Sequence, residues 1–148
     1  MTARPSFATY DPAEVYITFG GQPITGYADG TFVEIEFDEQ QWNKVTGADG
    51  HTSRAKTNNY AGTITITLLA TSAGNDILNS FWQADRRNNA GVVPISVLDK
   101  LGNTKWAAAY AWIRQMPTQG YSKETETREW VIDCAELLGS AGGNQIAS

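Results

Sequence analysis

The sequence of 148 residues contains one cysteine, Cys134, and one histidine, His51. A single cysteine excludes a disulfide within the chain and a cysteine-rich zinc site. His51 stands in "GADGHTSR", which has the spacing of neither a catalytic triad, an EF-hand nor a phosphate-binding loop. The sequence therefore predicts a protein that is not an enzyme and that uses no metal or other cofactor.

Long apolar runs and an excess of positive charge are also missing. No segment approaches the roughly 20 apolar residues of a membrane span, and residues 1–14 lack the apolar core of a secretory signal. The formal net charge is −5, whereas a protein that grips nucleic acid normally carries a basic surface. The sequence thus predicts an acidic protein that is made inside the cell and has no membrane partner.

What the sequence does contain is a series of segments with the two-residue period of β-strands. The clearest is "TITITLL", in which Ile64, Ile66 and Leu68 alternate with threonines. "EVYITFGGQPITGY" holds two further runs joined at Gly20-Gly21, which predicts a hairpin because glycine tolerates positive φ. Further strands are expected at 31–38, 92–98, 104–115 and 126–137.

One helix interrupts this pattern, at about residues 74–87. Its apolar residues Ile77, Leu78, Phe81 and Trp82 recur at helical spacing and form one stripe. With about six to seven strands and this helix, the chain is expected to form a mainly β domain. The expected divisions are an extended arm at 1–13, one domain at 14–138 with a long polar loop at 39–60, and a flexible Gly-rich tail at 139–148.

The strand at 31–38 carries acidic residues along one side. In "TFVEIEFDE" every second residue is apolar, and between them stand Glu34, Glu36 and Asp38. These carboxylates lie about 6.6 Å apart on one face, where they repel one another and have no basic neighbour in the local sequence. A solvated strand face is one explanation. The other is a face that looks into a cavity shared between copies of the chain.

The loop expected at 39–60 exceeds the roughly 12–15 residues above which a loop is usually functional or disordered. It carries His51, Arg54 and Lys56 with no acid after Asp49. A basic loop on an acidic domain favours an electrostatic contact with a neighbouring copy, although a solvated excursion explains the charges equally well. Trp42 leaves a further alternative, a β-sandwich module that binds glycans by stacking.

The order of these elements resembles that of the major tail tube proteins of long-tailed bacteriophages, most closely those with contractile tails. The resemblance covers roughly residues 10–138. Its most specific parts are "YDPAEVYITFGGQPITGYADGTFVEIEFDEQQWNKVTGADG" and "REWVIDCAE". It implies a β-sandwich or partly closed barrel with one flanking α-helix.

The resemblance also implies a function and partners. Copies of such a protein form hexameric rings, and the rings stack into a hollow tube for DNA ejection, with no specific binding of the DNA. Expected partners are further copies of the chain and the tail sheath, baseplate or initiator, tape-measure and tail terminator proteins. The expected location is the virion tail, assembled in the cytoplasm of the bacterial host.

Three groups of site residues follow as hypotheses. The residues expected to line the lumen are Glu34, Glu36, Asp38, Thr63, Thr65 and Thr67. The residues expected in a loop that contacts the adjacent ring are Trp42, Lys44, Asp49, His51, Arg54 and Lys56. On the outer helix, the expected exposed residues are Asn79, Gln83 and Arg87, where a sheath protein would meet the tube.

Overall fold

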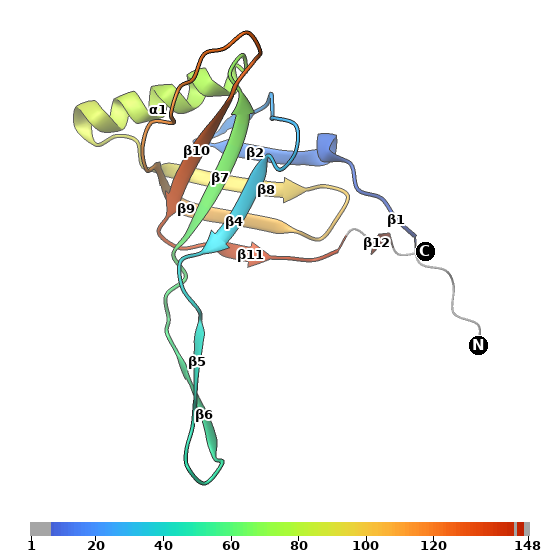
Figure 1. Cartoon of the computed structure of the whole chain (residues 1–148), viewed down its shortest axis with the longest axis vertical. Helices are drawn as coiled ribbons and strands as arrows, with labels where there is room; N and C mark the ends of the chain where they lie inside the picture. Colours follow the sequence, from blue (N-terminus) through green and yellow to red (C-terminus); the bar gives the residue numbers. More distant parts are fainter. Residues whose placement is uncertain (1–6, 144, 147–148) are drawn as a thin grey trace.

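The computed structural model describes residues 7–143 and 145–146, and this part of the chain forms a mainly β fold with one α-helix (Figure 1). The strands are β1 (Phe7–Ala8), β2 (Val15–Phe19), β3 (Gln22–Ile24), β4 (Val33–Phe37), β5 (Trp42–Thr46), β6 (Thr52–Lys56), β7 (Gly62–Leu69), β8 (Val93–Asp99), β9 (Lys105–Ile113), β10 (Thr127–Cys134), β11 (Leu138–Ser140) and β12 (Gln145–Ile146). The helices are α1 (Gly74–Asn88) and a 3-10 turn at Pro12–Glu14.

Eight of these strands form one antiparallel sheet in the order β3-β2-β8-β9-β10-β7-β4, with β11 beside β9. Strand β9 changes partner along its length, because residues 105–107 pair with β11 and residues 111–113 pair with β10. The sheet therefore folds over, and the β10-β7-β4 layer crosses the β2-β8-β9 layer (Figure 1). It does not close, since β3 and β4 each pair on one side only. The expected β-sandwich with one flanking helix is confirmed.

The core lies between the two layers and is supplied by alternate residues of the strands. In β7, Ile64, Ile66 and Leu68 are fully buried, as the alternation of "TITITLL" predicts. Trp130 of β10 and Phe19 of β2 are the largest side chains in this core. Because successive residues of a strand point to opposite faces, each layer keeps a second, outward face for other contacts.

Helix α1 closes one end of the sandwich, and its start and end follow from the sequence. Leu78 is fully buried, and Phe81 meets Phe19 edge-on with ring centroids 5.1 Å apart. Gly20 has a φ of 60°, and a Cβ at this position would overlap the Phe81 ring. The predicted hairpin at Gly20-Gly21 is confirmed, and it brings β2 and β3 close to the helix.

A buried asparagine joins the start of α1 to the sheet. The Asn75 side-chain amide donates to the carbonyl oxygens of Leu69, Ala70 and Ser72, at 2.8, 3.3 and 3.2 Å. Its Oδ1 accepts a hydrogen bond of 2.9 Å from Nε1 of buried Trp130. The Asn75 amide therefore satisfies backbone carbonyls at and just after the end of β7 and the indole N–H of Trp130 in β10. These hydrogen bonds fix where the helix begins.

The segment 39–60 differs from the predicted loop. It forms the hairpin β5–β6, which projects far from the body of the molecule (Figure 1). The turn uses Gly50 at a φ of 84°, and Gly47 N–H donates to His51 O at 2.8 Å. All ten strand residues are exposed, so the segment lacks the apolar–polar alternation that marks a half-buried strand.

The two ends of the chain also differ from the prediction. Residues 138–140, at the start of the expected flexible tail, form β11 on the edge of β9, and β12 pairs with β1 of the expected arm. Residues 1–6, 144 and 147–148 lie outside the described residues. The strand count exceeds the predicted six to seven mainly because short paired segments such as these carry too few residues to show a period.

Candidate functional site

The outward face of the β10-β7-β4 layer gathers all six residues predicted to line a lumen. Across the strands, Glu34 stands opposite Thr65, and Glu36 stands opposite Thr63. Asp38 follows the end of β4 and accepts a hydrogen bond of 3.2 Å from the Thr63 hydroxyl. We call this surface the polar face; its predicted members are Glu34, Glu36, Asp38, Thr63, Thr65 and Thr67.

Strand β10 and the end of β9 add residues to the polar face that sequence reasoning missed. Glu129, Val131 and Asp133 stand opposite the three threonines of β7. Arg114, just beyond β9, reaches the same face. The alternation of "REWVIDC" carried the signal for β10, since Trp130 and Ile132 between these residues are buried. What the sequence did not show was that β10 lies beside β7.

The charges of the polar face fall into a paired group and an unpaired group. Arg114 binds the Asp133 carboxylate through Nη2 at 2.6 Å and Nε at 3.0 Å, and it donates to the Thr63 hydroxyl at 3.2 Å. The hydrogen bonds and charge of Asp133 raise the pKa of Arg114. By contrast, three carboxylates of this face have no hydrogen bond or ion pair within the described chain. These free carboxylates are Glu34, Glu36 and Glu129.

The one cysteine lies under this network. Cys134 is buried, and burial, followed by the charges of Asp133 and Asp38, raises the pKa of its thiol to about 12. A thiol in such surroundings stays protonated and is a poor nucleophile. Cys134 is therefore a packing residue of the core.

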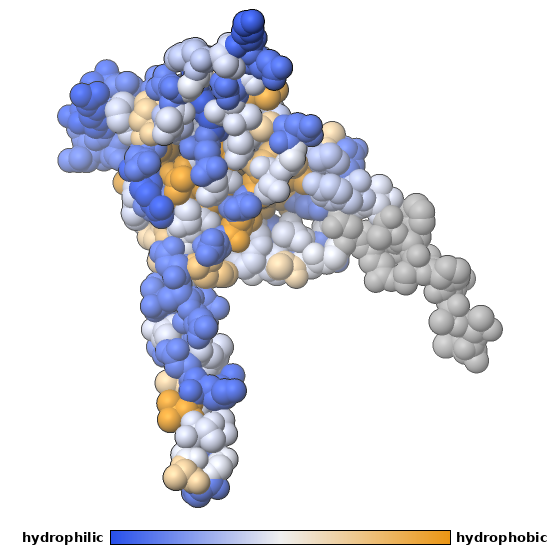
Figure 2. Space-filling view, viewed as in Figure 1, coloured by the Kyte–Doolittle hydropathy of each residue, from blue (hydrophilic) through white to orange (hydrophobic). Residues whose placement is uncertain are grey.

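The projecting hairpin has two faces of different chemistry, because cross-strand partners share a face. One face carries the pairs Trp42–Lys56 and Lys44–Arg54, together with Thr46 and Thr52; we call it the cationic face. The other carries Asn43 opposite Ala55 and Val45 opposite Ser53; we call it the neutral face. Figure 2 shows the arm as mainly hydrophilic with a small hydrophobic patch, and Val45 is 69% exposed.

Trp42 does not offer an open aromatic platform. The Arg54 guanidinium lies 3.9 Å from the centroid of its ring, and the Lys56 ammonium lies 5.9 Å away. The remaining tryptophans are buried or half-buried. Stacking of the Arg54 guanidinium covers the Trp42 ring, so the arrangement gives no support to glycan binding.

The hairpin tip holds the remaining residues predicted for the contact between rings. Asp49 Oδ1 accepts a hydrogen bond of 3.1 Å from the backbone N–H of His51, which shapes the turn. Both side chains are exposed. The structure therefore brings the six predicted residues onto one hairpin, with four of them on its cationic face and two at its tip.

The outer face of α1 differs in part from the prediction. Arg87 is exposed as expected, whereas Asn79 and Gln83 are half-buried. The exposed positions of the helix are Asp76, Ser80, Arg86, Arg87 and Asn88. Trp82, which belongs to the predicted apolar stripe, is only half-buried, and the Arg86 guanidinium lies over it, 5.5 Å from its ring centroid.

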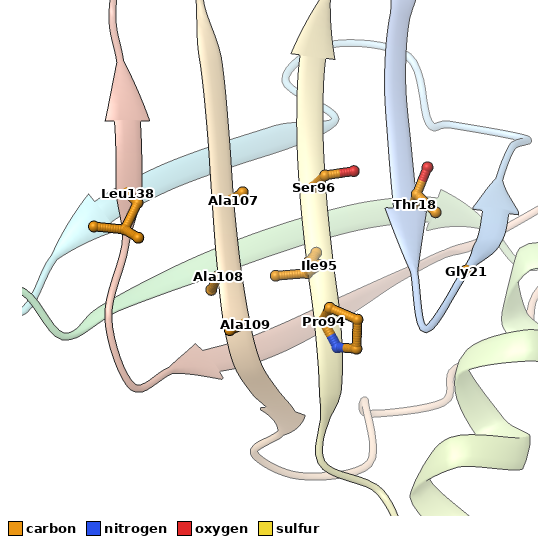
Figure 3. Close-up of a pocket in the computed structure, with 9 residues that line it drawn as sticks. All are labelled: Thr18, Gly21, Pro94, Ile95, Ser96, Ala107, Ala108, Ala109 and Leu138. Atoms are coloured by element: carbon orange, nitrogen blue, oxygen red, sulfur yellow. The ribbon is translucent and has the colours of Figure 1, made fainter.

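The outward face of the β2-β8-β9 layer has a different character from the polar face. It forms a shallow groove of about 440 Å³ without a charged side chain (Figure 3). Its lining residues are Thr18, Gly21, Pro94, Ile95, Ser96, Ala107, Ala108, Ala109 and Leu138. The sandwich thus presents one acidic outer face and, on the other layer, a groove without charged side chains, while the exposed Lys105 lies on the same face toward the start of β9.

Two further features bear on the class of protein. No helix in the described part of the chain is long and apolar enough to cross a membrane. Within residues 7–143 and 145–146, no group of three or more His, Cys, Asp or Glu side chains is placed to hold a metal ion.

A comparison with known protein families identifies the family to which this chain belongs. Residues 16–140 match the family of the bacteriophage PhiTE tail tube protein, from the start of the sandwich to β11. The chain is a phage tail tube protein. It belongs to a family of virion structural proteins of the phage tail and is not an enzyme, which confirms the resemblance seen in the sequence.

A curated relative and several solved structures are similar to this tail tube protein. "Structural protein ORF10" of Pseudomonas phage KPP10 is 28% identical over 156 residues, covering all of this chain and 89% of the relative. The tube terminating cap of the anti-feeding prophage has the same fold, with a TM-score of 0.64 at 12% identity over 93% of this chain and 94% of the other. A chain of the extracellular contractile injection system PVC, in its extended sheath-tube complex, gives a TM-score of 0.60 at 12% identity, covering 90% and 92% of the two chains.

Proposed function

We propose that six copies of this tail tube protein form a ring, and that rings stack into a hollow tube through which DNA is ejected. The observation that carries this proposal is the projecting hairpin. Its strands pair only with each other, and an isolated two-stranded hairpin is at best marginally stable in water. A second surface is therefore needed to cover it, and in a stack the next ring supplies that surface.

The ring follows from the edges of the sheet. Strands β3 and β4 each have one unpaired side, and native proteins cover or pair such edges. A head-to-tail contact whose rotation closes gives a ring and removes these edges, whereas stacking is open-ended and gives a filament.

The polar face is assigned to the lumen. Duplex DNA carries one negative charge about every 1.7 Å along its axis, so a basic wall would hold it. Of the charged groups described above on the polar face, five are carboxylates and one is a guanidinium. Such an acidic wall repels the phosphates and lets the DNA slide without specific binding.

The outer helix and the ends of the tube are assigned to other tail proteins. The exposed side of α1, including Arg87, is the surface on which a tail sheath would lie. The ends of the tube would meet the baseplate or initiator and the tail terminator, and a tape-measure protein would occupy the lumen before ejection. Assembly would take place in the cytoplasm of the bacterial host.

Negative-stain electron microscopy of the purified protein at high concentration tests this proposal. Tube fragments from virions serve as seeds in a parallel sample, because subunits can wait for an initiator. We expect hollow rings or tubes with a lumen wide enough for duplex DNA. Small uniform particles in both samples, with no growth from the seeds, would overturn the proposal.

A further inference from the structure

The projecting hairpin is joined to the body by two short segments that belong to neither of the neighbouring ladders. The β4–β7 ladder ends at Phe37, and the ladder of the hairpin begins at Trp42. We call the residues between them, 38–41 and 57–61, the neck. Within the neck, Asn58 has a left-handed φ of 58°. Because neither ladder runs through the neck, strand pairing does not by itself fix the direction in which the hairpin leaves the body.

A row of alternating cations and aromatic rings leads from the hairpin into the neck. The Arg54 guanidinium lies 3.9 Å from the centroid of the Trp42 ring. The Lys56 ammonium is shared between two rings, 5.9 Å from the centroid of Trp42 and 5.6 Å from the centroid of Tyr60. We call Arg54, Trp42, Lys56 and Tyr60 the cation–aromatic row. Since Tyr60 belongs to the neck and the other three residues belong to the hairpin, the row spans the junction.

The last ring of the row is held by the body of the molecule. The Tyr60 carbonyl oxygen accepts a hydrogen bond of 2.8 Å from Leu137 N–H, and the Tyr60 ring meets Phe37 edge-on with centroids 6.4 Å apart. Phe37 in turn meets the Trp106 ring at 5.6 Å, and both of these rings pack against the core. Side-chain contacts therefore continue from the hairpin through Lys56 and Tyr60 into the sandwich.

The strength of the row is matched to the weakness of the hairpin. The face of an aromatic ring attracts a cation, and at an exposed site one such contact favours the contacting state about two- to fivefold. The three cation–ring contacts of the row together favour a formed hairpin about ten- to a hundredfold. Because an isolated two-stranded hairpin is at best marginally stable, a factor of this size decides whether the hairpin is mostly formed or mostly open.

From this row we infer that Lys56 and Tyr60 are positioning residues, which keep the hairpin formed and directed away from the body in the dispersed subunit (Figure 1). The strand residues of the hairpin stay exposed, so the row prepares the hairpin without replacing the surface that covers it in a tube. The inference concerns a single copy and does not depend on the proposed rings or tube. Its consequence is that a subunit does not have to order its hairpin when it binds, and such ordering lowers affinity.

Amide hydrogen exchange of the dispersed subunit tests the inference. In the unaltered protein, the amides that pair β5 with β6 should exchange at least about tenfold more slowly than those of an unstructured chain. Lys56→Gln removes two of the three contacts and should lower this protection about four- to twenty-fivefold, or to that of an unstructured chain. Tyr60→Leu removes one contact and should lower it about two- to fivefold. The amides of β7 report on folding in the same experiment and should stay protected in every variant.

Matched variants separate the row from charge and size alone. Lys44→Gln removes the same charge from the same cationic face, but Lys44 makes none of the three contacts of the row. Lys56→Arg keeps the cation, and Tyr60→Phe keeps the ring. All three variants should preserve the protection of the hairpin amides within about a factor of two.

The direction of the hairpin is measured separately, as the distance between two spin labels on the dispersed subunit. The labels are attached at Ser53→Cys on the neutral face and Ser80→Cys on the exposed side of α1, while Cys134 is buried and does not take up label. One narrow distance distribution is expected. Tyr60→Leu should broaden it, because the neck then loses its contact with Lys56.

Two outcomes would overturn the inference. The first is exchange of the hairpin amides at the rate of an unstructured chain in the unaltered subunit. The second is unchanged protection and an unchanged label distance in both Lys56→Gln and Tyr60→Leu, because strand pairing alone would then hold the hairpin. Neither outcome bears on the proposed function, which fails if the unaltered protein forms neither rings nor tubes.

Discussion

Replacing Asn75 by alanine gives the sharpest test of how this fold is held together. The substitution removes the acceptor of the Trp130 indole N–H, which is left buried without a partner, and three donations to backbone carbonyls. An unsatisfied buried donor costs about 1–3 kcal/mol, and a typical lost hydrogen bond costs about 1 kcal/mol net. Because the carbonyls near the helix start regain water in part, the expected total is about 2–4 kcal/mol.

The measurement is urea unfolding of the dispersed subunit, followed by tryptophan fluorescence. For a chain of this size each kcal/mol corresponds to a shift of the midpoint temperature of about 2–4 °C, so a thermal scan should show a drop of roughly 5–15 °C. Ser80→Ala is the control, since the Ser80 hydroxyl is exposed and bonds only to Ile77 O within the helix. It should change the free energy of unfolding by less than about 0.5 kcal/mol.

A double-mutant cycle with Trp130→Phe isolates the hydrogen bond between the helix and the sheet. Since the phenylalanine has no N–H, the second substitution should remove much of the penalty of Asn75→Ala, with a coupling energy of about 0.5–3 kcal/mol. A loss below about 0.5 kcal/mol for Asn75→Ala, or additive effects in the cycle, would refute the role given to this amide.

Three further predictions follow from the same structure. Gly20→Ala should cost about 2–3 kcal/mol in urea unfolding, because its Cβ enters the Phe81 ring and its backbone is left-handed, whereas Gly21→Ala, with open space around it, should cost only about 1 kcal/mol from its positive φ. Cys134 should resist thiol reagents at pH 8 until the chain unfolds. Because its folded pKa of about 12 exceeds the ordinary value of 9.0, its contribution to stability is complete below pH 9 and is lost as the pH rises toward 12, which pH-dependent unfolding checks. Arg114→Gln should change stability by less than about 1 kcal/mol, since it breaks a half-exposed ion pair; a larger loss would mean that the pair is part of the core.

The candidate surfaces were predictable to different degrees. The sequence alone predicted that the acidic residues of β4 share one face and that the threonines of β7 share one face. This was possible because the direction of side chains along a strand alternates with a period of two residues, whatever the strand packs against. The β5–β6 hairpin could not be predicted from the sequence, because a strand that is exposed on both faces lacks the alternation of apolar and polar residues. The identity of its charged residues was visible all the same, since charge does not depend on the element that carries it.

What the sequence by itself determined is therefore local: the alternation of the strands, the apolar stripe of α1 and the sign of the charge on each segment. The tertiary structure alone decided which strands are neighbours. It placed Glu129 and Asp133 beside the threonines of β7, some sixty residues earlier in the chain, and set Arg114 against Asp133. It also left the three cations of the cationic face and the three free carboxylates of the polar face without an ion pair in the described part of one copy. The physical reason is that strand pairing and register are chosen by the sum of many weak contacts between distant segments, whereas the period of a strand follows from its own backbone.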